Sequence, residues 1–387
     1  MAYPSFTRAT FGGRVDLEGA TFEGDAGFRE ATFERARSFG PLVVLDSLAL
    51  EEASFLQTAE IAVSARRLFL VGTSFPAGVG IRVRWADVVL DEAVFGAPSI
   101  LSGAPPFDRL DEESLVQALA GNGEKTWEAV DEDRLRLEQG GRPRVASVRR
   151  ANVGTLVLSD ADLRGCRFVK AHNLDGLWLE GDVEFAHQPD LWWWARRRVL
   201  AEEHQWRHTH GSLRAQEGWY GVHVRPPARF LRGDPEVENA LDASSIAGIY
   251  RDLRKGREDS KDEPGAADFY YGEMEMRRFD TTKPRAERLI IWLYWLVSGY
   301  GLRASRALLA LAVTVLVFAV LLYAWGFPSQ RSFLDALTFS AESTTSLFRP
   351  PERELTLAGE WLQIGLRLLG PLFFGLALLS LRGRVKR

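Results

Sequence analysis

The stretch FTRATFGGRVDLEGATFEGDAGFREATFERARSF, residues 6–39, determines how the first part of this chain folds. Its large apolar residues recur at steps that alternate between five and six positions: Phe6, Phe11, Leu17, Phe22, Phe28, Phe33 and Phe39. Alanine stands two places before several of them, at Ala9, Ala20, Ala26 and Ala31. The pattern predicts a coil in which the large side chains fill the axis and the small ones fit where the wall is tight.

A longer repeat follows this stretch. The segments LALEEASF (48–55), LFLVGTSF (68–75) and VVLDEAVF (88–95) recur every twenty residues. A fixed period of this length indicates a solenoid. Five residues per side and twenty per turn predict a right-handed quadrilateral β-helix. A β-rich domain with chance spacing is the alternative, and the number of consecutive matches argues against it.

The pattern resembles the pentapeptide-repeat family, whose consensus is A-(D/N)-L/F-x-x. The best matches are ATFGG (9–13), ATFEG (20–24), ATFER (31–35) and, after a break, ADLRG (161–165). The resemblance covers roughly residues 5–100 and 150–186, and the six-residue steps depart from the strict repeat. We therefore predict a solenoid over residues 1–100 whose coils resume over residues 150–186.

Residues 101–149 leave this register and are predicted to form a helical insertion. The run LDEESLVQALA (110–120) has apolar residues at helical spacing and acids in its first turn. The segment GNGEKT (121–126) is not a phosphate loop, because Glu124 precedes the lysine where that motif requires glycine and no strand comes before it.

Residues 187–243 are predicted to form a cap and linker rich in Trp and Arg. Three tryptophans, residues 192–194, run into three arginines, residues 196–198, a composition that could stack bases and hold phosphates. Capping of the solenoid end or contact with lipid headgroups is the favoured interpretation, and nucleic acid is disfavoured. His204 and His208 could share a helix face, but without a suitable partner we expect no metal site.

Residues 244–283 are predicted to form a helical hairpin. The first helix, SSIAGIYRDLRKGRED (244–259), begins with a capping serine, and AADFYYGEMEMRRF (266–279) forms the second. The break SKDEPG between them predicts an antiparallel arrangement. Glu273 and Glu275 lie on different faces of a helix, so they are not a pair of catalytic carboxylates.

Residues 284–303 are predicted to form an interfacial helix. The run ERLIIWLYWLVSGYGLR (287–303) has only about fourteen apolar positions between charges, which is short for a span. Its aromatic residues are of the types that concentrate at membrane interfaces. These interfacial candidates are Trp292, Tyr294, Trp295 and Tyr300. A helix lying on the inner leaflet could couple cytoplasmic movement to the segments that follow.

Residues 304–387 are predicted to form a hairpin of two transmembrane helices. The runs ALLALAVTVLVFAVLLYAW (307–325) and WLQIGLRLLGPLFFGLALLSL (361–381) are each long enough to cross a bilayer. Basic residues flank the hairpin at Arg285, Arg288, Arg303, Arg306, Arg382, Arg384, Lys386 and Arg387. Its loop, 326–360, is mostly acidic, so the positive-inside rule places both termini in the cytoplasm.

The start of the chain, MAYPSFTRATF, has no apolar signal-peptide core, which agrees with a cytoplasmic body. Arginine is much more frequent than lysine, which is typical of a GC-rich bacterial genome. We therefore expect a multi-pass protein of the bacterial plasma (inner) membrane. The lone cysteine, Cys166, excludes an intramolecular disulfide.

The segment FSAESTTSLF (339–348) resembles the pore loop of two-span, potassium-channel-like subunits. The resemblance implies a pore helix over residues 333–343 that ends at Thr344 and Thr345. The pore-lining candidates are Glu342, Ser343, Thr344, Thr345, Ser346 and, in the second span, Arg367. No glycine follows the threonines, so a potassium filter is not expected and any pore would have relaxed selectivity.

The sequence favours a non-enzymatic membrane protein in which a pentapeptide scaffold is anchored by the channel-derived hairpin. No catalytic motif is present, and no cofactor is expected. An oligomeric ion channel gated by its cytoplasmic part remains an alternative, and a DNA-mimic or protein-binding module is a weaker one. The expected partners are the lipid bilayer, further copies of the chain, a cytoplasmic protein on the solenoid and, for a channel, inorganic ions.

Overall fold

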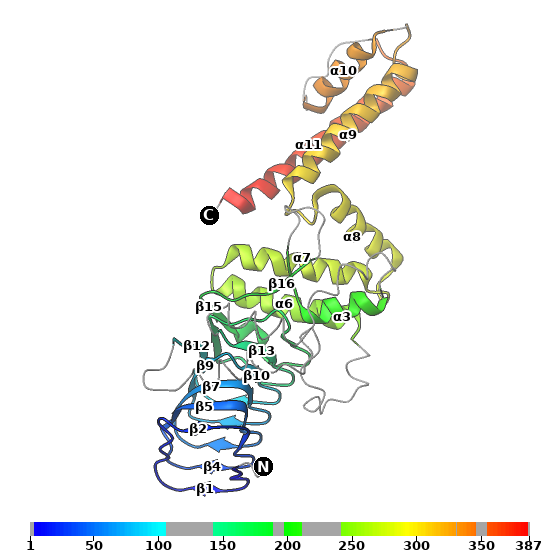
Figure 1. Ribbon diagram of the computed structural model, residues 1–387. Coiled ribbons are helices and arrows are strands. Elements are labelled where there is room, and N and C mark those ends of the chain that lie inside the picture. The colour runs from blue at the N-terminus through cyan, green and yellow to red at the C-terminus, as the bar shows by residue number, and fades with distance from the viewer. Residues whose placement is uncertain are drawn as a thin grey trace, which may run out of the picture. The chain divides into compact units, whose positions relative to one another are not determined.

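The computed structural model describes residues 4–105, 142–188, 197–210, 241–329, 331–345 and 354–385. The chain divides into two compact units, Met1–Met276 and Arg277–Arg387. Figure 1 follows the elements of both units in chain order. The predicted insertion falls largely on residues 106–141, and these lie outside the described residues, as do Trp192, Trp193 and Trp194.

Unit 1 begins with a β-solenoid of about six turns. One sheet is a parallel stack of two-residue strands, one from each successive turn. These strands are β1 (Thr10–Phe11), β4 (Thr32–Phe33), β6 (Ser54–Phe55), β8 (Ser74–Phe75) and β11 (Val94–Phe95). Parallel pairing of equivalent positions keeps every side chain above its counterpart in the neighbouring turn.

A second, larger sheet is formed from the remaining strands of the coil. These are β2 (Thr21–Phe22), β3 (Ala26–Gly27), β5 (Ser38–Ala49), β7 (Ala59–Phe69), β9 (Val79–Arg84), β10 (Asp87–Val89), β12 (Ser99–Gly103), β13 (Arg144–Ser147), β14 (Leu156–Ser159) and β15 (Trp178–Glu180). Strand β13 pairs with β10 in parallel, so the coil is back in register before residue 150, earlier than the sequence indicated.

The length of a turn changes along the coil. Thr10 pairs with Thr32 and Thr32 with Ser54, so the first turns contain 22 residues. Ser54 pairs with Ser74 and Ser74 with Val94, so later turns contain 20. Four steps that alternate between five and six residues add up to 22, which accounts for the longer turns. The predicted twenty-residue turn is therefore wrong for the first part of the coil.

Stacked phenylalanines form the core of the coil. Phe33 lies between Phe11 and Phe55, with ring centroids 4.9 Å and 4.4 Å away and nearly parallel planes. The stack continues to Phe75 and Phe95 at 5.3 Å and 5.7 Å. Stacked aromatic pairs add to the stability gained by burying their surface. The even spacing in the sequence thus becomes a column along the axis.

One corner of every turn has a left-handed backbone. The residues there are Arg8, Glu30, Glu52, Gly72, Glu92, Arg150 and Lys170, with φ between 55° and 65°. Such a conformation is costly for residues other than glycine. The backbone N–H groups of Arg8, Glu30 and Glu92 each donate to a carbonyl of the next turn at 2.8 Å, which offsets the cost.

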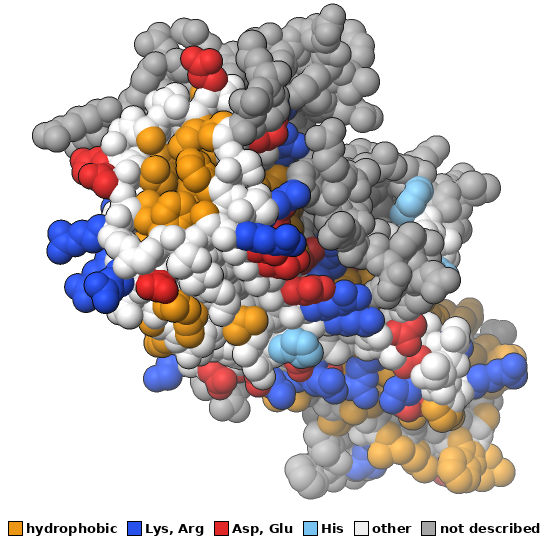
Figure 2. Space-filling view, turned by 90° about the horizontal axis from the view of Figure 1, so that it is seen from below, with side chains coloured by type: hydrophobic (Ala, Val, Ile, Leu, Met, Phe, Trp, Pro, Cys, Tyr) orange, Lys and Arg blue, Asp and Glu red, His pale blue; other side chains and the backbone are white. Residues whose placement is uncertain are grey.

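Among the described residues, the inner side chains of the first turn are less covered than those of later turns. Phe6 is 39% exposed, whereas Phe28, which stacks on it, is buried. Figure 2 shows this end of the coil as a hydrophobic patch framed by charged side chains.

The far end of the solenoid is covered by a short hairpin and three helices. Strands β16 (Ala186–His187) and β17 (Arg198–Val199) pair antiparallel. The helices are α3 (Ala201–His210), α6 (Ala243–Asp259) and α7 (Glu263–Phe279).

The N-cap of α6 is Asp242, which accepts from the Ser245 N–H at 2.9 Å. The predicted serine cap is therefore wrong, because Ser244 donates its hydroxyl to Asp242 instead.

Unit 2 is helical and contains the two apolar helices. It comprises α8 (Arg285–Ser298), α9 (Ala304–Leu321), the π-helical turn η3 (Leu322–Gly326), α10 (Phe333–Thr345) and α11 (Leu357–Val385). In Figure 1, α9 and α11 run side by side and α10 lies beside them near their loop end. Two segments, Ala304–Gly326 and Leu357–Ser380, are long and apolar enough to cross a membrane.

Candidate functional site

The apolar hairpin exposes most of its surface. In each of the two apolar segments, only 17% of the most apolar 18-residue stretch is buried. The mean hydropathies are 2.7 for the first segment and 1.7 for the second. The exposed residues include Leu308, Leu309, Val313, Leu316, Val317, Val320, Trp361, Ile364, Leu368, Leu372, Phe374, Leu378 and Leu379. The core helix of a soluble protein is mostly buried, and these two helices are not.

Helix α10 packs into the hairpin through its small polar residues. Ser340 is buried and donates to the Val315 carbonyl at 2.9 Å, and Thr344 donates to the Ser340 carbonyl at 2.8 Å. Gly370 lies so close to Thr344 that a Cβ there would come within 2.5 Å of its methyl group. Two of the predicted pore-lining residues, Ser343 and Thr344, are thus buried within the unit.

The two charged pore-lining candidates lie at one level of the hairpin. Phe339 packs with Leu366, and Thr344 abuts Gly370, so α10 and α11 run alongside each other through this region. Glu342 and Arg367 fall between these contacts. Glu342 is exposed and Arg367 is half-buried. Ser346 and the side chain of Thr345 lie outside the described residues.

Three of the four predicted interfacial aromatics lie on the surface of α8. Trp292 is exposed, and Tyr294 and Trp295 are half-buried. Tyr300 differs, because it is buried, with its ring 5.9 Å from that of Tyr294. The left-handed turn through Gly299, Tyr300 and Gly301 directs this ring inward, a position that its type alone did not indicate.

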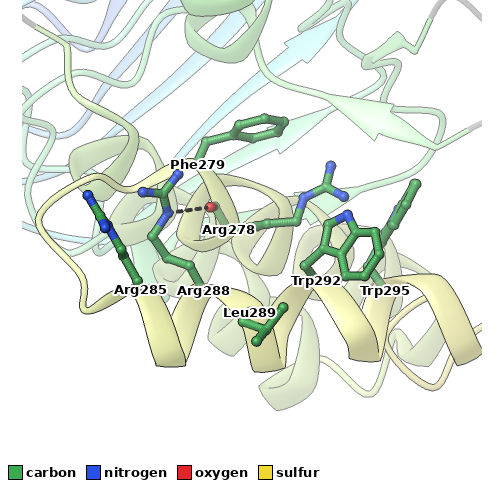
Figure 3. Close-up of a pocket in the computed structure, with 7 residues that line it drawn as sticks. All are labelled: Arg278, Phe279, Arg285, Arg288, Leu289, Trp292 and Trp295. Atoms are coloured by element: carbon green, nitrogen blue, oxygen red, sulfur yellow. Dashed lines mark hydrogen bonds between the residues drawn. The ribbon is translucent and has the colours of Figure 1, made fainter.

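A cavity of about 470 Å³ lies where the end of α7 meets the start of α8. Figure 3 shows the residues that line it: Arg278, Phe279, Arg285, Arg288, Leu289, Trp292 and Trp295. The Arg278 guanidinium lies 4.4 Å from the ring centroid of Trp295, a cation–π arrangement. Nε of Arg288 donates to the Arg278 carbonyl at 3.4 Å. We call this the arginine–tryptophan pocket.

Three of the seven residues that line the pocket are arginines. In the described part of the chain, no carboxylate forms an ion pair with Arg285 or Arg288. The one acid of α8, Glu287, lies 3.3 Å from Lys283 and 3.7 Å from Arg277. Arg285, Arg288 and both tryptophans were each indicated separately, the arginines by the charge pattern and the tryptophans by their residue type. The sequence did not indicate that Arg278 and Phe279 join them, because that depends on the turn between two helices.

A buried ionic cluster lies in unit 1, centred on Glu203. Arg197 donates to the Glu203 carboxylate, and Arg207 does so through Nε at 2.6 Å. The Tyr250 hydroxyl donates to the same carboxylate at 2.7 Å. Arg207 also donates to Glu275 at 3.0 Å, which closes the cluster. Every member is largely or completely buried, so the charges must be satisfied by one another.

The cluster sets the ionisation of its central carboxylate. Burial by itself raises the pKa of Glu203, but the charges of Arg197 and Arg207 and the hydrogen bonds from Arg197 and Tyr250 outweigh it. They lower its pKa from 4.5 to about 2. The neighbouring Glu202 is affected in the opposite direction, because burial raises its pKa and only weaker interactions oppose it.

No pattern in the sequence indicates this cluster. The sequence predicted the arginines after Trp194 as headgroup or cap residues, whereas Arg197 is 3% exposed and pairs with Glu203. His204, one of the histidines considered for a metal, is also buried. Among the described residues, no group of His, Cys, Asp and Glu is arranged to hold a metal ion.

Comparison with known proteins identifies the repeat. Residues 6–37 match a family model described as pentapeptide repeats (9 copies). The searches of curated proteins and of solved structures found no match. The prediction of pentapeptide repeats from the phenylalanine spacing is confirmed. The chain thus combines a pentapeptide-repeat β-solenoid with helices, two of which are long and apolar enough to cross a membrane.

Proposed function

We propose that this protein is a membrane-anchored scaffold without enzymatic activity. The observation that carries the proposal is the exposed apolar hairpin on a chain that also contains a pentapeptide solenoid. The hairpin of α9 and α11 holds the protein in a bacterial inner membrane. The solenoid, a right-handed coil with four sides, presents a rigid surface to a cytoplasmic protein partner.

Charge supports the orientation of the anchor. Arg285, Arg288, Arg303 and Arg306 come before the first span, and the loop between the spans is rich in acids. Basic residues remain on the cytoplasmic side of bacterial membranes. Both termini are therefore cytoplasmic, and the loop is outside.

The surface of the coil supports a protein partner over DNA mimicry. Arg29 pairs with Glu51 at 2.8 Å, and Arg150 pairs with Glu92 at 3.0 Å, each between neighbouring turns. A DNA mimic requires long rows of carboxylates that stand in for phosphates. The described coil instead alternates charges of opposite sign, which suits a polar protein interface.

Cysteine labelling tests the anchor and its orientation together. A cysteine introduced as Ser332→Cys, in the loop between the spans, is expected to react with a membrane-impermeant maleimide in intact spheroplasts. Glu18→Cys, on the exposed first turn, serves as control and is expected to react only after lysis. Burial raises the pKa of the native Cys166 thiol, so it stays unreactive as background. Labelling of both positions before lysis, or of neither after it, would contradict the topology.

A second candidate function is an ion channel of relaxed selectivity. The short helix α10 packs against both apolar helices, as a re-entrant pore helix would. Two helices cannot enclose a pore, so conduction requires a homo-oligomer, and four copies is the number that the channel resemblance implies. Movement of the cytoplasmic part would reach the spans through α8, and inorganic ions would be the permeating species.

Ion flux into proteoliposomes separates the channel from the plain anchor. The channel candidate predicts oligomers in detergent and similar fluxes of potassium and sodium. Glu342→Gln and Arg367→Gln are then expected to change the flux several-fold, because charges beside a pore act on ions at close range. Glu360→Gln, an exposed change at the start of α11, is the control and should not alter it. A monomer without flux would eliminate the channel and leave the anchor.

A further inference from the structure

Three arginines line the arginine–tryptophan pocket. Arg285 and Arg288 are one turn apart on α8, and Arg278 reaches the same cavity from the end of α7 (Figure 3). The charges of Arg285 and Arg288, one helical turn apart, repel each other unless an anion lies between them. Since the acid of α8, Glu287, faces Lys283 and Arg277, the described chain supplies no carboxylate to Arg285 or Arg288.

The chemistry of the lining favours a phosphate group. The guanidinium fork matches two oxygens of a phosphate at once, and arginine is the preferred residue for this geometry. The first turn of α8 has no side-chain cap at Pro284, so its N–H groups add to the positive potential. The cavity of about 470 Å³ is large enough for a headgroup and too small for a folded partner.

The apolar walls favour a lipid over a soluble phosphate. Leu289 and Trp292 line the cavity, and they also lie on the exposed surface of α8. That surface continues through Ile290, Leu293 and Leu296, which are 66%, 46% and 49% exposed. A soluble phosphate needs no such wall, whereas a phospholipid places acyl chains beside its headgroup. Tryptophan is also favoured at this depth of a membrane.

We propose that the arginine–tryptophan pocket binds the phosphate of an anionic phospholipid of the inner leaflet. This inference rests on the proposed membrane location. Arg285 and Arg288 hold the phosphate oxygens, and Trp292 and Leu289 contact the glycerol and the upper part of the acyl chains. Arg278, whose guanidinium is stacked on Trp295, adds a positive charge on the tryptophan side of the cavity (Figure 3). Bound lipid would hold α8 at the surface of the membrane, directly before the first span.

The test is native mass spectrometry of the full-length protein in detergent, titrated with phosphatidylglycerol, with phosphatidylcholine and with inorganic phosphate. Wild-type protein is expected to bind one phosphatidylglycerol more tightly than phosphatidylcholine. Arg285→Gln and Arg288→Gln should each weaken that binding about tenfold, which corresponds to the loss of one charge-assisted hydrogen bond. Arg288→Lys keeps the positive charge but loses the paired N–H donors of the guanidinium, and it should also weaken the binding of phosphatidylglycerol.

Arg303→Gln is the matched control, since it removes one positive charge from the same membrane side without lining the cavity. It is expected to leave the affinity unchanged. Equal losses for Arg303→Gln and Arg288→Gln, or no preference for the anionic lipid, would overturn the pocket. If inorganic phosphate displaced phosphatidylglycerol at a similar concentration, the pocket would be a site for soluble phosphate and not for a lipid. None of these results would contradict the proposed membrane anchor, because cysteine labelling tests the anchor separately.

Discussion

Replacing Phe33 with alanine is expected to destabilise the solenoid by about 3–5 kcal/mol. The Phe33 ring is fully buried and is stacked between those of Phe11 and Phe55. Its removal loses the transfer free energy of the ring and leaves a gap in a column whose neighbours cannot shift along the axis. In a solenoid each turn contacts only its neighbours, so the gap also uncouples the first turn from those above it.

The free energy of unfolding can be measured by chemical denaturation of the full-length protein in mild detergent, followed by the β-sheet signal in circular dichroism. Leu56→Ala, in the next turn and 47% exposed, is the control and should change stability by less than about 0.5 kcal/mol. The loss of stability caused by Phe33→Leu should lie between the losses caused by Phe33→Ala and by Leu56→Ala. If Phe33→Ala were as mild as Leu56→Ala, the aromatic column would not be what stabilises the coil.

The second large effect is expected at Glu203. Glu203→Ala should destabilise unit 1 by about 3–5 kcal/mol, because it leaves Arg197 and Arg207 buried without their shared counter-charge. Tyr250 also loses the carboxylate to which it donates. The same denaturation experiment measures the loss, here from the helical signal of the cap.

Glu258→Ala is the matched control for this substitution. Glu258 pairs with Arg254 at 2.9 Å, but its side chain is half exposed, and such surface pairs contribute less than about 1 kcal/mol. A double-mutant cycle between Glu203 and Arg197 should show strong coupling, since each is the buried partner of the other. Additive effects in that cycle, or a loss no greater than that of Glu258→Ala, would contradict the role of the cluster.

The same cluster predicts a pH dependence. The pKa of Glu203 is lowered in the folded state from 4.5 to about 2, so its contribution to stability is present above pH 4.5 and is lost as the pH falls toward 2. Glu202 and Asp268 act in the opposite sense, because burial raises their pKa values. The difference in unfolding free energy between wild type and Glu203→Gln cancels those contributions, and it should shrink between pH 5 and pH 2.

The repeat was predictable because its period follows from local geometry. Because the chain directs a side chain to the axis every five or six residues, large apolar residues recur at that spacing in the sequence, as they do from Phe6 to Phe39. The apolar runs before Trp325 and after Trp361 indicated helices for the same reason, since length and composition decide them. Even the 22-residue turns were present in the alternating steps, although the later copies suggested 20.

The sites depended on contacts between elements. Asp242, not Ser244, caps α6, because both residue types cap helices and only the entry of the chain selects one. Arg197 sits among arginines and tryptophans that suggest a surface, yet α3, α6 and α7 bury it. No local pattern joins it to Glu203 and Tyr250, which is more than 40 residues further along the chain.

By itself the sequence determined the solenoid and the apolar hairpin, since both arise from periodicity and from the length of apolar runs. Only the tertiary structure decided which charged residues meet. The left-handed corner of the coil, the cluster around Glu203 and the contact of Arg288 with the Arg278 carbonyl all depend on how successive elements turn. The physical reason is that burial of a periodic face is specified by neighbours in the chain, whereas pairing of charges is specified by neighbours in space.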